Sequence, residues 1–263
     1  MKTSQLIPAA GKRFRIAACK PEETFGVSRK QAEKALAVHV ERLPELHDLL
    51  YAEHKRAVLI VLQGMDASGK DGTIKHVMSG VNPRNCTVTS FKVPTPRERD
   101  HDFLWRVHAA TPGKGEIGIF NRSHYEDVLV TRVHKLIDGA ECRRRYAHIN
   151  AFEQMLSESG VTLLKFCLHI SREEQRQRMD ERLADPSKNW KFNEDDLKER
   201  EFWKQYQEAY EDAIGNCNTK YAPWHVIPAD RKWFRNYAVS EVLVETLRGF
   251  GMSFPKMLIK SAG

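Results

Sequence analysis

The sequence predicts an α/β fold in which helices cover both faces of an open parallel sheet, and three observations support this prediction. Residues 57–62 are a continuous apolar run rich in β-branched side chains, as a central parallel strand requires because both of its faces are buried. Further strand-like runs alternate with helical segments along the chain. A glycine-rich segment of the form G-x-x-x-x-G-K follows the first apolar run and precedes a helical segment.

The N-terminal part of the chain contains an irregular segment and then a long helix. Residues 1–27 are polar and interrupted by glycine and proline, so we expect them to form an extended arm. Ser28 is suited to cap a helix that continues to about Leu50, with apolar residues at helical spacing. Because proline lacks the backbone N–H and its ring clashes with the preceding turn, Pro44 is expected to kink or split this helix.

The rest of the chain alternates between strands and helices. In addition to the first strand, we expect strands at residues 87–93, 116–120, 161–170 and 224–227. We expect helices at residues 73–78, 97–109, 126–137, 141–159 and 234–247. A long, mostly charged segment separates the last two strands.

Composition excludes several classes of protein. The chain has 263 residues, with 42 Lys and Arg against 35 Asp and Glu, and its formal charge of +7 suggests a polyanionic partner. We expect no membrane span, because no apolar run approaches the roughly 20 residues that a helix needs. There is also no continuous apolar stretch of the kind found in a signal peptide. The five scattered cysteines predict neither a disulfide framework nor a cysteine zinc site, which favours the reducing cytoplasm.

The glycine-rich segment is predicted to bind phosphate. Its glycines let successive backbone N–H groups point inward, the following helix adds the partial positive charge of its N-terminus, and Lys70 reaches the terminal phosphates. A tight strand-to-helix turn with an incidental lysine is the structural alternative. The candidate phosphate-binding residues of this loop, besides Lys70, are Gly64, Ala67, Ser68, Gly69, Asp71, Gly72 and Thr73.

Two carboxylates make this loop unusual. Most such loops have Ser or Thr after the lysine to hold magnesium, but this chain has Asp71. Either Asp71 ligates the metal directly, or Thr73 or Ser68 supplies the hydroxyl. Asp66 would face the bound phosphates and be repelled unless it holds a metal or receives a proton, which suggests a catalytic role. A helix-capping aspartate is the alternative.

A second group of polar residues follows the third strand. This position is the carboxyl edge of the sheet, where open α/β folds bind their ligands. Arg122 can offer its fork of donors to a phosphate, and Glu126 and Asp127 can hold magnesium or orient an acceptor. Alternatively, both acids only favour a helix N-terminus. His124 and Tyr125 are interpreted as packing or supporting groups and not as catalysts.

Four blocks of the sequence resemble the polyphosphate kinase 2 family: residues 64–72, 120–130, 185–192 and 222–233. The resemblance implies a thymidylate-kinase-like P-loop kinase fold with three layers, a parallel five-stranded sheet and a helical lid. On this basis we expect a single kinase domain at residues 28–250 with the lid at about 171–200, preceded by the arm and followed by a tail at 251–263. The implied reaction is reversible phosphoryl transfer between inorganic polyphosphate and a nucleotide, with Mg²⁺ or Mn²⁺.

The resemblance also implies catalytic roles for particular residues. The loop carboxylate and lysine of the family match Asp66 and Lys70, the arginine at the strand end matches Arg122, and the lid arginine matches Arg178. Asp66 is expected to position the acceptor phosphate and the metal, while the cations stabilise charge on the transferred group.

One departure from the family pattern points to a subgroup. Many members have Asp-Arg where this chain has Asn121-Arg122, and the resemblance implies that Glu126 is the compensating acid. This arrangement resembles the subgroup that phosphorylates AMP as well as ADP. The candidate metal ligands are therefore Asp66, Glu126 and Asp127.

Basic residues outside the loop are expected to line a polyphosphate and nucleotide channel. Besides Asn121, the candidate binding residues are Lys92, Arg106, Arg132, Arg182 and Lys188. The partners expected from this reading are polyphosphate and adenine or guanine nucleotides, with no nucleic acid and no membrane, and the resemblance implies a homo-oligomer, either a dimer or a tetramer. Two alternatives stay open: an ATP-dependent nucleotide or small-molecule kinase, and a non-catalytic, basic nucleic-acid-binding protein.

Overall fold

The fold is known from a computed structural model, which describes residues 1–9, 14–187, 189 and 194–255. Its centre is a parallel sheet of five strands in the order β2-β3-β1-β4-β5. The strands are β1 (Ala57–Gln63), β2 (Cys86–Ser90), β3 (Ile117–Asn121), β4 (Val161–His169) and β5 (Trp224–Pro228). The predicted α/β class and the five predicted strands are confirmed, although β2 ends three residues earlier than expected.

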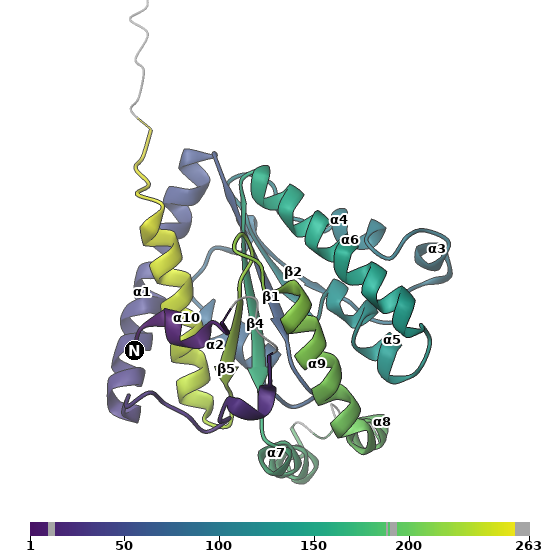
Figure 1. Cartoon of the computed structure of the whole chain (residues 1–263). Coiled ribbons are helices and arrows are strands. Elements are labelled where there is room, and N and C mark those ends of the chain that lie inside the picture. The colour runs from purple at the N-terminus through teal and green to yellow at the C-terminus, as the bar shows by residue number, and fades with distance from the viewer. Residues whose placement is uncertain (10–13, 188, 190–193, 256–263) are drawn as a thin grey trace, which may run out of the picture.

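Helices cover both faces of the sheet and make three layers (Figure 1). The helices on one face are α1 (Arg29–Glu53), α2 (Lys70–Val77) and α10 (Lys232–Gly249), and the main ones on the other are α6 (Gly139–Glu158) and α9 (Trp203–Cys217). The central strand β1 is buried along its whole length, which explains its continuous apolar sequence. No helix in the described part of the chain is long and apolar enough to span a membrane.

The long first helix begins where the sequence predicts, but it is not split. Ser28 and Gln31 form a reciprocal capping box at its start. The helix then continues through Pro44 to Glu53 without interruption. The lost hydrogen bond at Pro44 is tolerated because the apolar stripe on both sides of it, including Leu43 and Leu46, is buried in the core.

Two of the other predicted helices are broken into shorter pieces. The segment expected at 97–109 consists of α3 (Pro96–Arg99) and α4 (Trp105–His108). Between them the Asp102 carboxylate accepts a hydrogen bond from the backbone N–H of Leu104, at 2.9 Å, and this local bond competes with helix continuation. The segment expected at 126–137 consists of a 3₁₀ turn (His124–Asp127) and the single-turn helix α5 (Val130–Val133).

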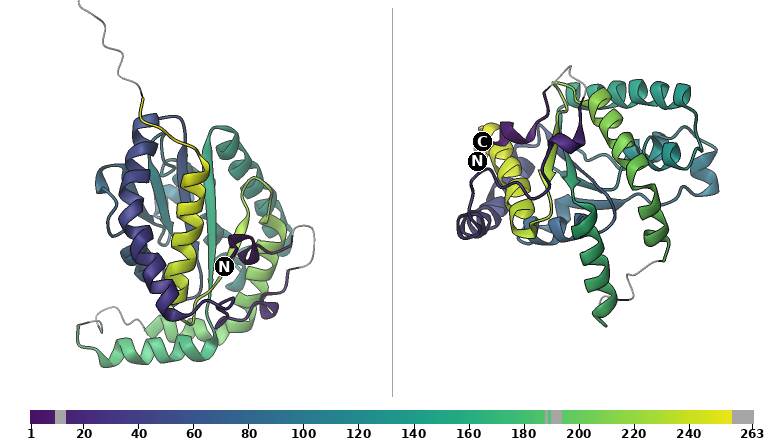
Figure 2. Two further views of the ribbon diagram at one scale, coloured as in Figure 1. Left: turned by 90° about the vertical axis from the view of Figure 1, so that its left-hand side faces the viewer. Right: turned by 60° about the horizontal axis from the view of Figure 1, so that its bottom comes forward.

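The N-terminal arm packs against the domain. It contains two short 3₁₀ helices, Thr3–Leu6 and Ile16–Ala18, and the side chains of Leu6 and Ile16 are buried in the core. The backbone N–H of Ile16 also donates to the carboxylate of Glu211 on α9, at 2.9 Å. Figure 2 shows the arm lying against one side of the domain, next to α10.

The lid region lies at the carboxyl end of the sheet. It contains α7 (Arg172–Ala184) and α8 (Glu194–Glu199), and a 3₁₀ turn (Arg200–Phe202) connects α8 to α9. Figure 1 shows α7 and α8 beyond the tip of β4. Because all strands are parallel, the segments that follow β1, β3 and β4 emerge at this same end, and the register pairs Leu62 of β1 with both Asn121 and Phe166.

Candidate active site

The phosphate loop connects β1 to α2, and its shape depends on glycine. Gly64 has φ +153°, and a Cβ there would lie 2.7 Å from both the Leu168 carbonyl oxygen and the Ser68 hydroxyl. Gly69 has φ +103°, and a Cβ there would collide with the guanidinium of Arg235. The loop conformation therefore requires glycine at both positions.

Arg178 lies behind the loop with its side chain buried. Its Nη1 donates to the carbonyl oxygens of Ala67 and Ser68, each at 3.0 Å, and its Nη2 donates to the carbonyls of residues 229–230 at 2.6 and 2.8 Å. Its Nε donates to Glu174 at 2.7 Å. A guanidinium has five N–H donors, so direct contact with a phosphate would break one of these bonds. In this structure Arg178 therefore supports the back of the loop through its bonds to Ala67 and Ser68.

Arg235 of α10 is a second buried arginine behind the loop, and sequence analysis missed it. Its Nη1 donates to the Ser68 carbonyl at 3.1 Å, and its Nε and Nη2 donate to the Asn236 side chain. Burial, with a smaller effect from Arg178, lowers the pKa of Arg235 to about 9. The available signal was a charged residue between Phe234 and the apolar part of a core helix.

Three of the predicted catalytic residues meet in front of the loop. Arg122 Nη2 lies 2.8 Å from Asp66 Oδ1, so the strand-end arginine and the loop carboxylate form an ion pair. Lys70 Nζ donates to the loop carbonyl oxygens of Gly64, at 2.7 Å, and Met65, at 3.3 Å. The arrangement follows from the parallel sheet, which brings the residues after β1 and β3 to one edge.

The site groups influence one another's ionisation. Burial lowers the pKa of Lys70, while the nearby carboxylates of Asp66 and Glu126 act in the opposite direction. Burial raises the pKa of Glu126, and the cations Arg122 and Lys70 partly offset this. Glu126 thus lies in the electrostatic field of Arg122, Lys70 and Asp66.

Asp71, which replaces the usual Ser or Thr of the phosphate loop, contacts Asn121, which departs from the family pattern. The Asn121 side-chain amide donates to Asp71 Oδ1 at 2.6 Å. The Thr73 hydroxyl donates to the Gly69 carbonyl at 3.0 Å, so it is already engaged. The Ser68 hydroxyl is buried and has no hydrogen-bond partner among the described residues. Of the two hydroxyls considered as metal ligands, Ser68 is therefore the one not already used by the loop.

Asp127 belongs to a different cluster from the loop carboxylates. Its carboxylate oxygens lie 3.9 Å from Arg106 and 3.6 Å from Arg145, and burial raises its pKa while these arginines lower it. Arg106 also donates to the Lys92 carbonyl at 2.8 Å. The immediate partners of Asp127 are thus cations, and its role as a metal ligand stays a prediction. Within the described residues, no group of three or more His, Cys, Asp or Glu is placed to hold a metal ion.

The remaining predicted binding residues lie farther along the chain. Arg132 on α5 pairs with Asp212 of α9 at 2.6 Å. Arg182 is half-exposed on α7, one turn beyond Arg178. Lys188 lies outside the described residues, as do parts of the block at 185–192.

Sequence analysis also missed two glutamines that support the site. Gln175 of α7 donates to the Asp66 backbone carbonyl at 2.9 Å, and it accepts from Arg200 at 2.7 Å. Gln63, the last residue of β1, donates to the Ser123 hydroxyl at 3.1 Å. The signal for Gln63 was a polar residue at the end of a buried apolar strand; nothing in the sequence singled out Gln175.

A lysine-bearing phosphate loop that faces an arginine and carboxylates, under helices at the edge of a parallel sheet, defines a P-loop phosphotransferase. The sequence profile described as polyphosphate kinase 2 matches residues 26–253. The chain belongs to the polyphosphate kinase 2 family, and the predicted family is confirmed.

Individual relatives agree with this assignment. The chain is 54% identical over 246 residues to an AMP/ADP-polyphosphate phosphotransferase of Meiothermus ruber, an alignment that covers 93% of this chain and 92% of the relative. It is 43% identical to an ADP-polyphosphate phosphotransferase of Rhodopseudomonas palustris, covering 89% and 85% of the two chains. The crystal structure of polyphosphate kinase 2 from Arthrobacter aurescens superposes with a TM-score of 0.95 at 41% identity, covering 99% of this chain and 94% of that one.

Proposed function

We propose that the protein transfers the terminal phosphoryl group of inorganic polyphosphate to AMP and to ADP, reversibly. The observation that carries the proposal is the meeting of Lys70, Asp66 and Arg122 at the phosphate loop of a member of this family. The similarity to a relative named for both nucleotides supports the assignment to AMP and ADP.

Each site residue has a role that follows from its charge and position. The loop amides and Lys70 hold the phosphates, and Arg122 stabilises the charge that develops on the transferred group. The acceptor is a phosphate oxygen, already ionised near neutral pH, so it needs orientation more than a base. Asp66, held beside Arg122, supplies that orientation. Arg178 keeps the loop in its binding shape through the carbonyl contacts behind it.

The residues present fit a hard divalent cation such as Mg²⁺ or Mn²⁺. Mg²⁺ is bound by one or two carboxylates together with substrate phosphates and water, and Asp66 and Glu126 are the carboxylates beside the loop. The unpartnered hydroxyl of Ser68 is a further oxygen at the loop. When bound, the metal would neutralise negative charge on the phosphates.

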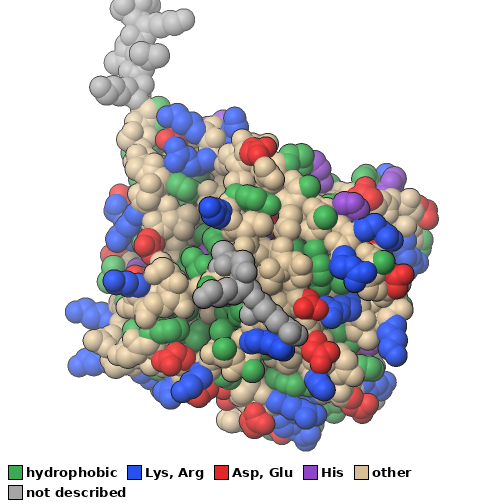
Figure 3. Space-filling model, viewed as in Figure 1, with side chains coloured by type: hydrophobic (Ala, Val, Ile, Leu, Met, Phe, Trp, Pro, Cys, Tyr) green, Lys and Arg blue, Asp and Glu red, His purple; other side chains and the backbone are tan. Residues whose placement is uncertain are grey.

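Cations beyond the loop are proposed to bind the rest of the polyphosphate chain and the nucleotide. Figure 3 shows Lys and Arg side chains gathered over the lid at the bottom of the view, interspersed with acidic ones. The cations assigned to this role are Lys92, Arg106, Arg132, Arg182 and Lys188, and the uncharged Asn121 is assigned to it with them. The link from Arg200 through Gln175 to the Asp66 backbone joins the lid region to the loop.

The decisive experiment supplies polyphosphate and AMP, or polyphosphate and ADP, in the absence of ATP. We expect ADP to appear in the first mixture and ATP in the second. If neither nucleotide is phosphorylated, and the protein instead phosphorylates a small acceptor with ATP, the proposal is wrong and the ATP-dependent kinase is the correct reading. Strongly salt-dependent nucleic-acid binding without either activity would favour the non-catalytic alternative.

Two further properties are part of the proposal. All five cysteines are free, which suits a reducing compartment, and we place the protein in the cytoplasm. We also propose that it assembles into a dimer or tetramer through α1 and the N-terminal arm. Light scattering coupled to size-exclusion chromatography would test the assembly, and a monomer at all concentrations would contradict it.

A further inference from the structure

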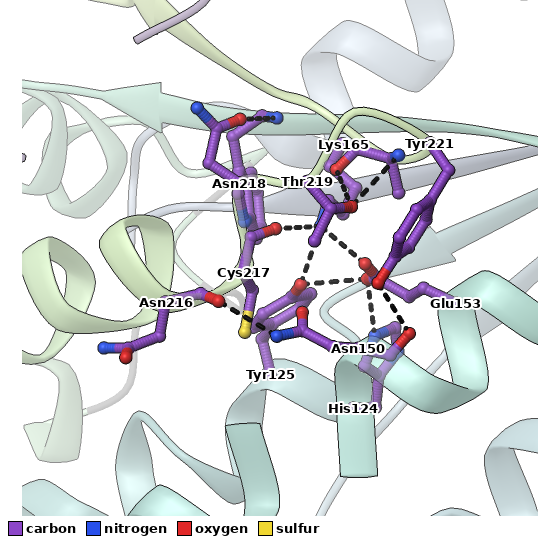
Figure 4. Close-up of polar contacts among 12 residues, drawn as sticks. His124, Tyr125, Asn150, Glu153, Lys165, Asn216, Cys217, Asn218, Thr219 and Tyr221 are labelled. Carbon is purple, nitrogen blue, oxygen red and sulfur yellow. Dashed lines mark hydrogen bonds and ion pairs between the residues drawn. The ribbon is translucent and has the colours of Figure 1, made fainter. Parts of the chain in front are cut away.

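Four polar side chains meet in the otherwise apolar core beside the segment that carries Arg122 (Figure 4). Lys165 comes from the middle of β4 and Glu153 from α6, while His124 and Tyr125 come from the 3₁₀ turn after β3. The side chains of all four are completely buried. The phosphoryl transfer described above uses none of them directly.

Lys165 is the centre of this cluster. Its Nζ donates to Glu153 Oε2 at 2.6 Å, to the Tyr125 hydroxyl at 2.9 Å and to the Cys217 carbonyl at 2.7 Å. These three bonds use all three N–H groups of the ammonium. The ammonium also lies 5.3 Å from the centre of the Tyr125 ring. Lys165 is therefore fully satisfied although it has no access to water.

Glu153 connects the ion pair to the turn. Its Oε1 accepts from the Tyr125 hydroxyl at 2.9 Å, and the same oxygen lies 3.2 Å from His124 Nε2. Burial by itself would raise the pKa of Glu153, but Lys165 and His124 outweigh burial and hold it below its ordinary value. The ionised carboxylate thus fixes two consecutive residues of the turn from one side.

The position of this cluster points to a role in the site. Burying an ion pair in a core costs desolvation energy, and well-packed apolar side chains often serve the stability of a fold equally well. Here the pair holds the middle of the segment 122–126, whose two ends carry Arg122 and Glu126. Arg122 has φ +62°, a left-handed conformation that a non-glycine residue keeps only where its surroundings impose it.

We infer that the Lys165–Glu153 pair positions the segment 122–126, so that the arginine and the glutamate at its ends meet the phosphate loop in the geometry required for transfer. The pair touches no substrate and acts through His124 and Tyr125, which lie between those ends. This inference rests on the proposed function, because it assigns a positioning role in that reaction.

Two substitutions at His124 form a matched test. His124→Gln places an amide N–H near the position of Nε2 and can keep the bond to Glu153. His124→Asn places its amide near Nδ1, an atom that has no hydrogen-bond partner among the described residues, and so loses the bond. We expect His124→Asn to lower kcat about ten- to a hundredfold with little change in the KM for AMP, and His124→Gln to retain most of the activity.

A second pair of variants removes one hydroxyl from each of two neighbouring tyrosines. Tyr125→Phe loses the bonds to Glu153 and Lys165, whereas Tyr221→Phe leaves both of these bonds in place and loses a bond to the Asn150 carbonyl, 3.0 Å away in the same region. We expect only Tyr125→Phe to lower kcat when both variants are assayed well below their melting temperatures. Equal losses in both variants, or wild-type kcat in Tyr125→Phe, would overturn the inference.

A measurement without substrate separates this inference from the proposed function. In isotope-labelled protein, the Nε–H nuclear magnetic resonance signal of Arg122, assigned by its absence in Arg122→Lys, reports on the environment of that side chain. We expect the signal to move in His124→Asn and Tyr125→Phe but to stay in place in His124→Gln and Tyr221→Phe. An unmoved signal in the first two variants overturns the positioning role. If the wild-type protein had no polyphosphate-dependent activity, the proposed function would be wrong. The signal of Arg122 would still show whether the cluster positions that side chain.

Discussion

At the scale of single residues, the cations of the site are paired with acceptors of the protein, and a bound phosphate would compete for them. The Asp66 carboxylate pairs with Arg122, and Lys70 donates to carbonyl oxygens of its own loop. A bound phosphate offers both cations stronger partners than these. Substrate binding is therefore expected to redirect side chains that are already in place.

Removing either cation should abolish measurable turnover without unfolding the protein. Lys70→Ala and Arg122→Ala each remove a charge that stabilises the transferred group, and we expect kcat to fall by at least ~10²–10³. Steady-state rates of polyphosphate-dependent ADP formation would measure this. Arg176→Ala is a suitable control, because Arg176 is exposed and pairs with Asp180 in the next turn of α7. Near-wild-type rates in either loop-facing variant would contradict the assignment of the site.

Gly69→Ala tests the support behind the phosphate loop. The added Cβ would collide with the buried guanidinium of Arg235, and the residue has a φ of +103°. We therefore expect a loss of nucleotide binding together with a lower melting temperature. Gly249→Ala is the control, because a Cβ there meets nothing within 4 Å. Isothermal titration with ADP and thermal unfolding of both variants would measure the effects, and an unaffected Gly69→Ala protein would disprove the tight packing of loop and arginine.

At the scale of elements, local signals set where helices begin, and packing sets whether they continue. The N-cap predicted at Ser28 is present, as part of a capping box with Gln31, and it defines the start of α1. Pro44 should break a helix on local grounds, yet α1 continues because its buried stripe packs on both sides of the proline. At 97–109 the local signal prevails over packing. Few side chains are buried there, and the hydrogen bond of Asp102 replaces helical bonds.

Ser28→Ala should weaken the start of α1 and leave the chemistry intact. The substitution removes the side-chain oxygen that accepts from the backbone of Gln31, and we expect the free energy of unfolding to fall by about 1 kcal/mol. Urea unfolding would measure this difference, with Ser28→Asp as the variant that restores a capping oxygen. Because the substitution changes only a cap at the start of α1, kcat should be unchanged; a large fall in kcat would show that α1 influences the site.

At the scale of the whole molecule, buried ionisable groups connect global stability to pH. His225 of β5 is one of these groups, and its side chain is 5% exposed. Burial is the main cause that lowers the pKa of His225 from 6.5 to about 4. The folded protein therefore resists protonation of this ring, while the unfolded chain takes up the proton near its ordinary pKa.

Lowering the pH from about 7 to about 5 should reduce the stability contribution of His225 by about 2 kcal/mol. The contribution is complete above the unfolded pKa of 6.5 and is lost progressively as the pH falls toward the folded value of about 4. His225→Gln cannot titrate, so its free energy of unfolding should decrease less steeply over this range. Urea unfolding at several pH values would measure both slopes, with the exposed His101→Gln as a control. Parallel slopes for wild type and His225→Gln would contradict the assigned pKa.

Local sequence and its periodicity were enough to predict the α/β class, the five strands and the phosphate loop. A parallel strand buried on both faces must be apolar throughout, and a phosphate loop must follow such a strand with glycines and a lysine at fixed spacing. The meeting of Asp66 and Arg122 could be expected too, because parallel strands end at one edge. Family blocks in the sequence added the reaction and the lid.

Only the tertiary structure decided which distant side chains support these residues. Arg178 and Arg235 come from different helices and share the Ser68 carbonyl, and Lys165 reaches the turn after β3 from another strand. A buried charge is stable only where all its partners are in place, and those partners lie far apart in the chain. Their identity therefore follows from packing in three dimensions and has no local signature.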